Sequence, residues 1–117
     1  MQNKIISKET AEHDVWGTSC DSWVLVDTEG LLVKQERMPA GTAEKLHFHS
    51  KAQQFFFILK GTATFYCEQD KLIVNAQKGL LIQPKTKHFI ANETDKSLDF
   101  LVISQPTTNH DRTIVKE

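Results

Sequence analysis

Two histidines separated by one residue give this sequence its clearest chemical signature. His47 and His49 lie in a segment, KLHFH, that reads as a short β-strand. Residues i and i+2 of a strand point to the same face, so both imidazoles can reach one ion. Gln54 follows His49 by five residues, and His88 lies 39 residues beyond His49. We predict that His47, His49, Gln54 and His88 together form one metal site.

The donor set of this predicted site is uncharged. Imidazole nitrogen suits Zn, Fe, Ni and related ions, and a glutamine offers only its neutral amide oxygen. Such a shell leaves the +2 charge of the ion uncompensated, which weakens binding and strengthens the ion as a Lewis acid. We expect one divalent transition metal: Zn, Fe, Ni or Mn. An alternative role for Gln54 is a hydrogen bond to a substrate or to a water molecule.

The elements that must position these residues are predicted to be short strands. Runs rich in β-branched and aromatic residues alternate along the chain with turn sequences that contain Gly, Pro, Asn or Asp. Turns at spacings of about 8–12 residues are typical of a β-sandwich or small barrel. Helical periodicity is absent, apart from one turn around Lys8 to His13. A length of 117 residues fits one domain. We therefore predict an all-β, single-domain fold.

The strand predicted over residues 31–38 offers a candidate acid–base group. Alternation places Val33, Gln35 and Arg37 on one face and Lys34 and Glu36 on the other. If the second face points inward, Glu36 supplies a carboxylate near the metal and can act as a general base. The alternative is a surface Glu36 paired with a lysine.

The run from Phe55 to Leu59 is apolar on both faces. Phe55 and Phe57 lie on one face, while Phe56 and Ile58 lie on the other. A strand of this kind is usually covered on both sides, but a small barrel has only one interior. We predict that a homodimer interface covers the outer face, since an exposed patch of this size promotes association. The alternative is that the N-terminal segment, with its two tryptophans, folds over it.

Two motifs in the chain resemble those of the cupin superfamily. Residues 41–61 are similar to the first cupin motif at five positions: Gly41, His47, His49, Gln54 and Gly61. Residues 79–92 resemble the looser second motif at four positions: Gly79, Pro84, His88 and Asn92. Asn92 is expected to stabilise a turn. Glutamine replaces the glutamate that the family usually has at position 54. Some cupins that act in the breakdown of sugar acids also use glutamine there.

The resemblance implies a small jelly-roll β-barrel, with one divalent metal inside it and frequent dimerisation. We expect the barrel core to span residues 31–104. Residues 1–30 would pack on the barrel or on a partner, and residues 105–117 would form a C-terminal tail. Cupins catalyse many reactions and some only bind ligands, so the fold does not select an activity.

The function that we predict is that of a metal-dependent enzyme acting on a small sugar-like or carboxylated substrate. The reaction would be of the isomerase, epimerase or lyase type, with Glu36 as the candidate catalytic residue. Two alternatives remain open. One is an Fe(II) dioxygenase, which needs free coordination positions for O2. The other is a non-catalytic module that binds a small molecule or a metal.

Composition argues against several other classes of function. Lys and Arg number 14 against 15 for Asp and Glu, without a basic run, which argues against nucleic acid as a partner. The longest apolar run, Phe55 to Leu59, is too short to cross a membrane. We expect no signal peptide from the N-terminal residues. Cys20 and Cys67 do not form a CxxC pair and are expected to be reduced thiols, the alternative being one disulfide between them. We expect a cytoplasmic protein.

Overall fold

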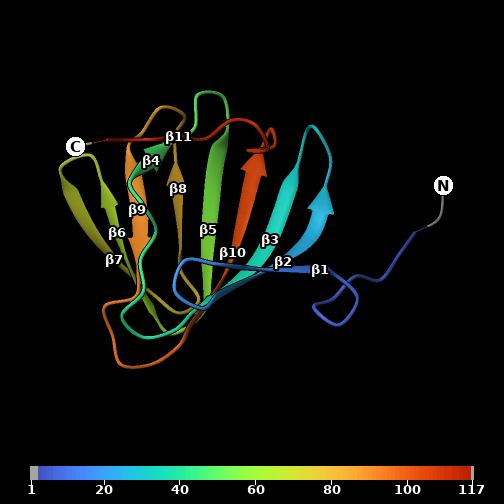
Figure 1. Cartoon of the computed structure of the whole chain (residues 1–117), viewed down its shortest axis with the longest axis horizontal. Helices are drawn as coiled ribbons and strands as arrows, with labels where there is room; N and C mark the ends of the chain where they lie inside the picture. Colours follow the sequence, from blue (N-terminus) through green and yellow to red (C-terminus); the bar gives the residue numbers. More distant parts are fainter. Residues whose placement is uncertain (1–2, 117) are drawn as a thin grey trace.

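The computed structural model describes residues 3–116, which form two antiparallel sheets (Figure 1). The six-stranded sheet has the order β1 (Glu12–Trp16), β2 (Cys20–Asp27), β3 (Leu32–Met38), β10 (Leu98–Gln105), β5 (Gln53–Lys60) and β8 (Gly79–Ile82). The five-stranded sheet has the order β11 (Thr113–Ile114), β4 (His47–Phe48), β9 (His88–Ala91), β6 (Thr62–Cys67) and β7 (Asp70–Asn75).

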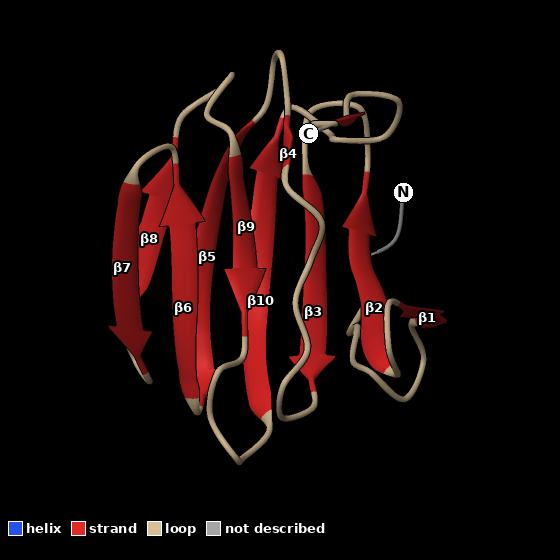
Figure 2. Ribbon diagram, turned by 60° about the vertical axis from the view of Figure 1, so that its left-hand side comes forward, coloured by secondary structure: helices blue, strands red, loops and turns tan. Residues whose placement is uncertain are grey.

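The two sheets lie face to face and enclose the core (Figure 2). Neighbouring strands are often distant in the sequence, since β10 pairs with both β3 and β5, and β9 pairs with both β4 and β6. This is the jelly-roll arrangement, so the predicted all-β fold is confirmed. Within residues 3–116 there is no helix long and apolar enough to cross a membrane.

Alternation along β5 explains how one strand serves both the core and the site. Phe56 is 3% exposed and Ile58 is fully buried, while Phe55, on the opposite face, is 37% exposed. Phe56 packs edge-on against Phe65 of the other sheet, with ring centroids 5.0 Å apart. Burying side chains of this size stabilises the fold by about 1.5–3 kcal/mol each. Gln54 precedes Phe56 by two residues and therefore points into the same interior.

Specific turn residues fix how the strands are connected. Gly61, between β5 and β6, has φ +89°, and a Cβ atom there would lie 2.6 Å from the Ser97 carbonyl oxygen, so only glycine fits. The Asn92 side chain donates to the carbonyl oxygens of Met38 and Lys96 and accepts from the Thr94 amide. Asn92 thus stabilises a turn, as expected from the sequence.

Strands near both ends of the described chain belong to the two sheets. Strand β2 pairs with β3 along most of its length, β1 forms the sheet edge, and β11 pairs with β4. Trp16, at the end of β1, lines an internal cavity. The alternative prediction is that the N-terminal segment, with its two tryptophans, folds over the outer face that carries Phe55 and Phe57. Trp16 lines the cavity instead, so it does not cover that face. Cys20 and Cys67 are free thiols.

Candidate metal centre

Three histidines from the five-stranded sheet converge on one point. His47 begins β4, His88 begins β9, and these two residues are directly paired across the strands. His49 lies just after β4, two residues from His47. The ring centroid of His47 is 5.0 Å from that of His49 and 4.5 Å from that of His88. One nitrogen from each ring lies within 4.8 Å of the others, so the three could hold a metal ion.

The hydrogen bonds of the three rings leave the same nitrogen free on each. The Nδ1 atoms of His47, His49 and His88 bond backbone carbonyl oxygens at 2.7, 2.5 and 2.8 Å. Because each Nδ1 must carry the proton to donate, each Nε2 keeps its lone pair. Nε2 of His49 and of His88 is buried and has no hydrogen-bond partner among the described residues. This is the tautomer and the hydrogen-bond pattern of metal-binding histidines.

Gln54 approaches the same cavity from the six-stranded sheet. It lies on β5 and is 7% exposed. Its Nε2 donates to Ser104 Oγ at 3.1 Å, while its Oε1 is buried without a partner within residues 3–116. The free amide oxygen is the donor that a neutral fourth ligand would offer. The residues present therefore fit a divalent ion.

A residue of the C-terminal segment, Asp111, holds His49 in place. The Asp111 carbonyl oxygen accepts the proton of His49 Nδ1. The Asp111 carboxylate also accepts from the backbone amides of Ser50, Lys51 and Ala52, at 2.8, 3.0 and 3.1 Å. Although burial acts to raise the pKa of Asp111, these bonds outweigh it and lower the pKa below its usual value. A charged Asp111 thus fixes both the ligand and the loop that follows it. No signal in the sequence marks this role.

Burial keeps the three imidazoles uncharged at neutral pH. It lowers the pKa of His47 from 6.5 to about 3, and it lowers the pKa of His49 and of His88 as well. Neighbouring positive charge acts in the same direction as burial. Neutral imidazole is the form that binds a metal, so the site does not have to release these protons first.

We expect the metal-free protein to lose stability as the pH falls below 6.5. The folded state holds His47 neutral down to about pH 3, whereas the unfolded chain takes up a proton near 6.5. Because the unfolded state binds more protons in this window, the stability that His47 confers is present above 6.5 and is lost on acidification. His47 alone contributes about 1.4 kcal/mol for each pH unit in the middle of the window. Denaturant titrations of chelator-treated protein between pH 7 and pH 4 measure this slope.

Two variants separate this effect from general acid denaturation. His47→Gln should reduce the slope by about 1.4 kcal/mol per pH unit. His110→Asn, at an exposed position with φ +64° that asparagine tolerates, is the matched control. Glu44, whose pKa is raised to about 7, and Glu36, whose pKa is also raised above 4.5, act in the opposite direction, but they are two groups against three. Equal slopes in the two variants would contradict the prediction.

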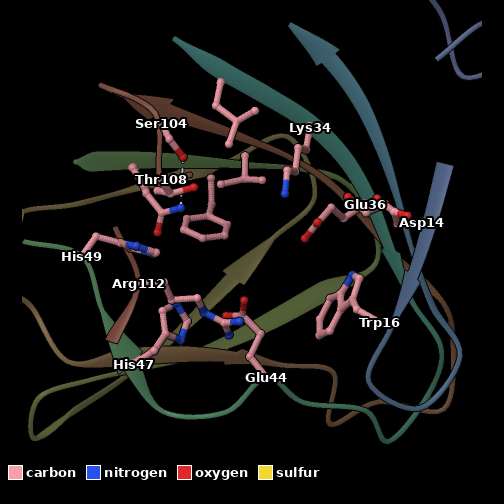
Figure 3. A pocket seen from close by; sticks show the side chains of 15 residues that line it. Asp14, Trp16, Lys34, Glu36, Glu44, His47, His49, Ser104, Thr108 and Arg112 are labelled. Atoms are coloured by element: carbon pink, nitrogen blue, oxygen red, sulfur yellow. Dashed lines mark hydrogen bonds between the residues drawn. The ribbon is translucent and has the colours of Figure 1, made fainter. Parts of the chain in front are cut away.

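A cavity of about 300 Å³ opens beside the histidines (Figure 3). Both sheets contribute to its wall, and Glu36 from β3 lines it with 9% of its surface exposed. Burial raises the pKa of Glu36. Of the two orientations of this carboxyl group that the sequence left open, the structure has the inward one. The remaining wall includes residues of every chemical type: Asp14, Trp16, Ser22, Leu32, Lys34, Glu44, Phe56, Val102, Ser104, Thr108 and Arg112.

Glu44 is a second carboxyl group in the cavity, and the sequence did not single it out. Its Oε1 accepts from the Ile90 amide at 3.1 Å, while its backbone amide donates to the Ile90 carbonyl oxygen at 3.0 Å. Burial, aided by repulsion from Glu36, raises the pKa of Glu44 to about 7. Strand alternation from His47 would place Glu44 on the opposite face, but the chain around Glu44 is only an isolated bridge between Ala43 and Ala91.

Arg112 brings a positive charge to the histidine side of the cavity. It lies between Asp111 and β11, and its side chain extends between His47 and Glu44 (Figure 3). The sequence placed Arg112 in a tail and gave no reason to select it. Two other cationic residues near the site in sequence, Arg37 and Lys45, are exposed.

The family profile of the cupin domain matches residues 34–104, more than half of the chain. This chain belongs to the cupin family. An uncharacterised protein of Methanocaldococcus jannaschii is 30% identical over 80 residues, which are 68% of this cupin. The matched segment spans 64% of that relative, less than two thirds of its length.

Solved structures share the fold at low sequence identity. A variant of Streptomyces PAC13 with uridine superposes with a TM-score of 0.83 at 14% identity, covering 98% of this cupin and 92% of that chain. A sugar phosphate isomerase from Silicibacter pomeroyi superposes with a TM-score of 0.78 at 17% identity, covering 89% of this cupin and 76% of that chain. Identities this low establish the fold alone.

Proposed function

We propose that this cupin is a metal-dependent enzyme of the isomerase, epimerase or lyase type, acting on a small sugar-like or carboxylated substrate. One observation carries the proposal. His47 and His49 share a cavity of about 300 Å³ with two carboxyl groups that are at least partly buried, those of Glu36 and Glu44, and His88 adjoins these two histidines. A cavity of this size lies at the lower end of the range for small-molecule sites.

The residues that would hold the metal are His47, His49, His88 and Gln54. In this neutral shell a divalent ion supplies Lewis acidity, which polarises a carbonyl group or stabilises an enolate. Arg112, on the same side of the cavity, adds a fixed positive charge that favours an anionic substrate group. Together these charges orient the substrate with its carboxylate or carbonyl end toward the histidines.

The two carboxyl groups are suited to move protons. Isomerisation, epimerisation and elimination next to a carbonyl all begin when a base removes a proton from carbon. Glu44 has a pKa of about 7, and Glu36 also has a raised pKa, so each can hold a proton near neutral pH and release it. General bases work best when their pKa lies close to the working pH. We assign proton removal to Glu44 and proton return to Glu36.

Comparison with known structures supports a small organic substrate. One similar structure is a sugar phosphate isomerase and another contains uridine. Sugar phosphates and nucleosides both carry a hydroxylated sugar, and a molecule of that kind suits a cavity with a mixed polar and apolar wall. The choice of reaction rests on the side chains of this chain, since the fold serves many reactions.

We also propose that this cupin is a cytoplasmic homodimer. Phe55 and Leu81 are paired across β5 and β8 on the outer face of the six-stranded sheet, where they are 37% and 50% exposed. Leu101 and Ile103 of β10 extend this apolar face toward β3. A second copy of the chain would remove the patch from water. The free thiols of Cys20 and Cys67 agree with a reducing compartment.

Solvent exchange tests the proposed reaction across a panel of candidate substrates. Zinc-, manganese-, nickel- or iron-loaded protein is incubated in D2O with hydroxy acids, uronic acids, aldoses and ketoses, and proton NMR follows the C–H next to the carbonyl. We expect deuterium incorporation or product formation with at least one compound, abolished by chelation and restored by metal. Substrate-dependent O2 uptake without exchange would favour the dioxygenase. Binding without either reaction would favour the non-catalytic module.

A further inference from the structure

The end of the cavity away from the histidines holds buried polar atoms that lack a partner. Trp16 Nε1 and Ser22 Oγ are buried without a hydrogen bond of normal geometry to any described residue, although Ser22 lies close enough to Glu36 to act to lower the pKa of its carboxyl group; both side chains line the cavity. Ser22 as a whole is 5% exposed. More than about 90% of buried polar groups in native proteins are paired. Two unpaired atoms on one cavity wall therefore indicate that a ligand completes their bonding.

The strand that carries Trp16 is otherwise exposed to solvent. Of the five residues of β1, the first four are exposed and only Trp16 is partly buried. A tight turn with positive φ at Gly17 (54°) and Ser19 (62°) leads into β2, and Trp16 pairs with Cys20. This hairpin carries the indole to the wall of the cavity opposite His47 and His49 (Figure 3).

The charges at the two ends of the cavity differ. Arg112 lies with the histidines, whereas Asp14 and Glu36 lie on the side of Trp16 (Figure 3). The Asp14 carboxylate repels a second anionic group at the Trp16 end, whereas a Glu36 carboxyl group that holds its proton offers a donor and an acceptor. Lys34 also lines the cavity and balances the charge of Asp14, so this end has no excess charge that would select an ion. An uncharged group that both donates and accepts hydrogen bonds fits this end best.

We propose that Trp16, Ser22 and Glu36 form a subsite for an uncharged, hydroxyl-bearing part of the substrate. Trp16 Nε1 donates to a substrate oxygen, and the Glu36 carboxyl group accepts from a substrate hydroxyl. The Ser22 hydroxyl can do either. This inference rests on the proposed function, because it takes the opposite end of the same molecule to lie at the histidines. A subsite of this kind favours a hydroxylated carboxylic acid as substrate. It disfavours a sugar phosphate that would have to place its phosphate at the Trp16 end.

Three probe molecules separate these possibilities. Glucuronate has a carboxylate and several hydroxyls, cyclohexanecarboxylate has the carboxylate and a six-membered ring without hydroxyls, and glucose 6-phosphate has a phosphate. Isothermal titration of each into zinc-loaded, full-length protein measures the dissociation constants. We expect glucuronate to bind at least about tenfold more tightly than cyclohexanecarboxylate, since leaving a buried polar atom without a partner weakens binding by about that factor.

Two conservative variants assign the preference to the subsite. Trp16→Phe keeps an aromatic ring but removes the N–H donor, and Ser22→Ala removes the hydroxyl. Each should weaken glucuronate binding about tenfold and leave cyclohexanecarboxylate binding unchanged. Unchanged binding of cyclohexanecarboxylate also shows that the variant is folded, because a misfolded protein would bind neither ligand.

The outcomes distinguish this inference from the proposed function. Equal binding of the two acids, no effect of Trp16→Phe on glucuronate, or binding of glucose 6-phosphate that is tightest of the three and unaffected by Trp16→Phe would each overturn the subsite, even if solvent exchange is observed. Selective binding of glucuronate that depends on Trp16 and Ser22 would support the subsite, even if solvent exchange is never observed.

Discussion

Protein in which His49 is replaced by alanine should emerge from purification almost free of metal. The imidazole of His49 supplies one of three ring nitrogens that lie within 4.8 Å of one another. Removing only an outer partner of a metal ligand typically weakens binding about 10–100-fold, so removing a ligand should weaken it more than about 100-fold. Elemental analysis of protein prepared without a histidine tag measures the change. We expect near one ion per chain in the parent and less than about a tenth of that in the variant.

Two further variants calibrate this result. His110→Asn changes an exposed histidine outside the cluster and should keep the metal content of the parent. Asp111→Ala removes the carboxylate that binds the loop after His49, and should weaken zinc binding about tenfold while the fold is retained. A parent that contains no metal and takes up none when zinc is added would contradict the metal site, as would an unchanged metal content in His49→Ala.

The second large effect is expected from Glu44→Gln. Glutamine keeps the oxygen that accepts from the Ile90 amide, so the loop should remain in place, but it cannot take up a proton. Removing a general base typically lowers the rate about 10²–10⁴-fold. The measurement is the rate of solvent exchange or product formation on the substrate that the D2O screen identifies. Glu9→Gln, at an exposed position near the N-terminus, is the matched control and should retain full activity.

The pH profile tests the assignment to Glu44 independently. A base must be deprotonated to act, so the rate of the parent should fall about tenfold per pH unit below the pKa of Glu44. That pKa is about 7 without a metal, and a nearby cation shifts it lower. The Glu44→Gln protein should lack this fall in rate on the acidic side of the pH profile (the acidic limb). If Glu36→Gln abolishes the limb while Glu44→Gln retains it, Glu36 is the base and the two carboxyl groups exchange roles.

Local patterns in the sequence were sufficient for the fold and for the centre of the site. Strand alternation alone places His47 and His49 on one face and carries Phe56 and Ile58 inward with Gln54. The spacing of the histidines and glycines resembles a cupin motif, and the cupin domain profile matches residues 34–104. These features depend on near neighbours in the sequence, where the period of two residues per strand fixes the direction of each side chain.

Tertiary structure decided which other groups share the cavity. The sequence left Glu36 between an interior and a surface position, and only the packing of β3 against the opposite sheet turned it inward. Glu44 lies outside a regular strand, so alternation does not predict its direction. Trp16 and Arg112 come from opposite ends of the chain, and the pairing of β1 with β2 and of β11 with β4 brings both to the cavity. Such pairings join residues that are far apart in the sequence, and they therefore leave no local period from which the position of either side chain could be predicted.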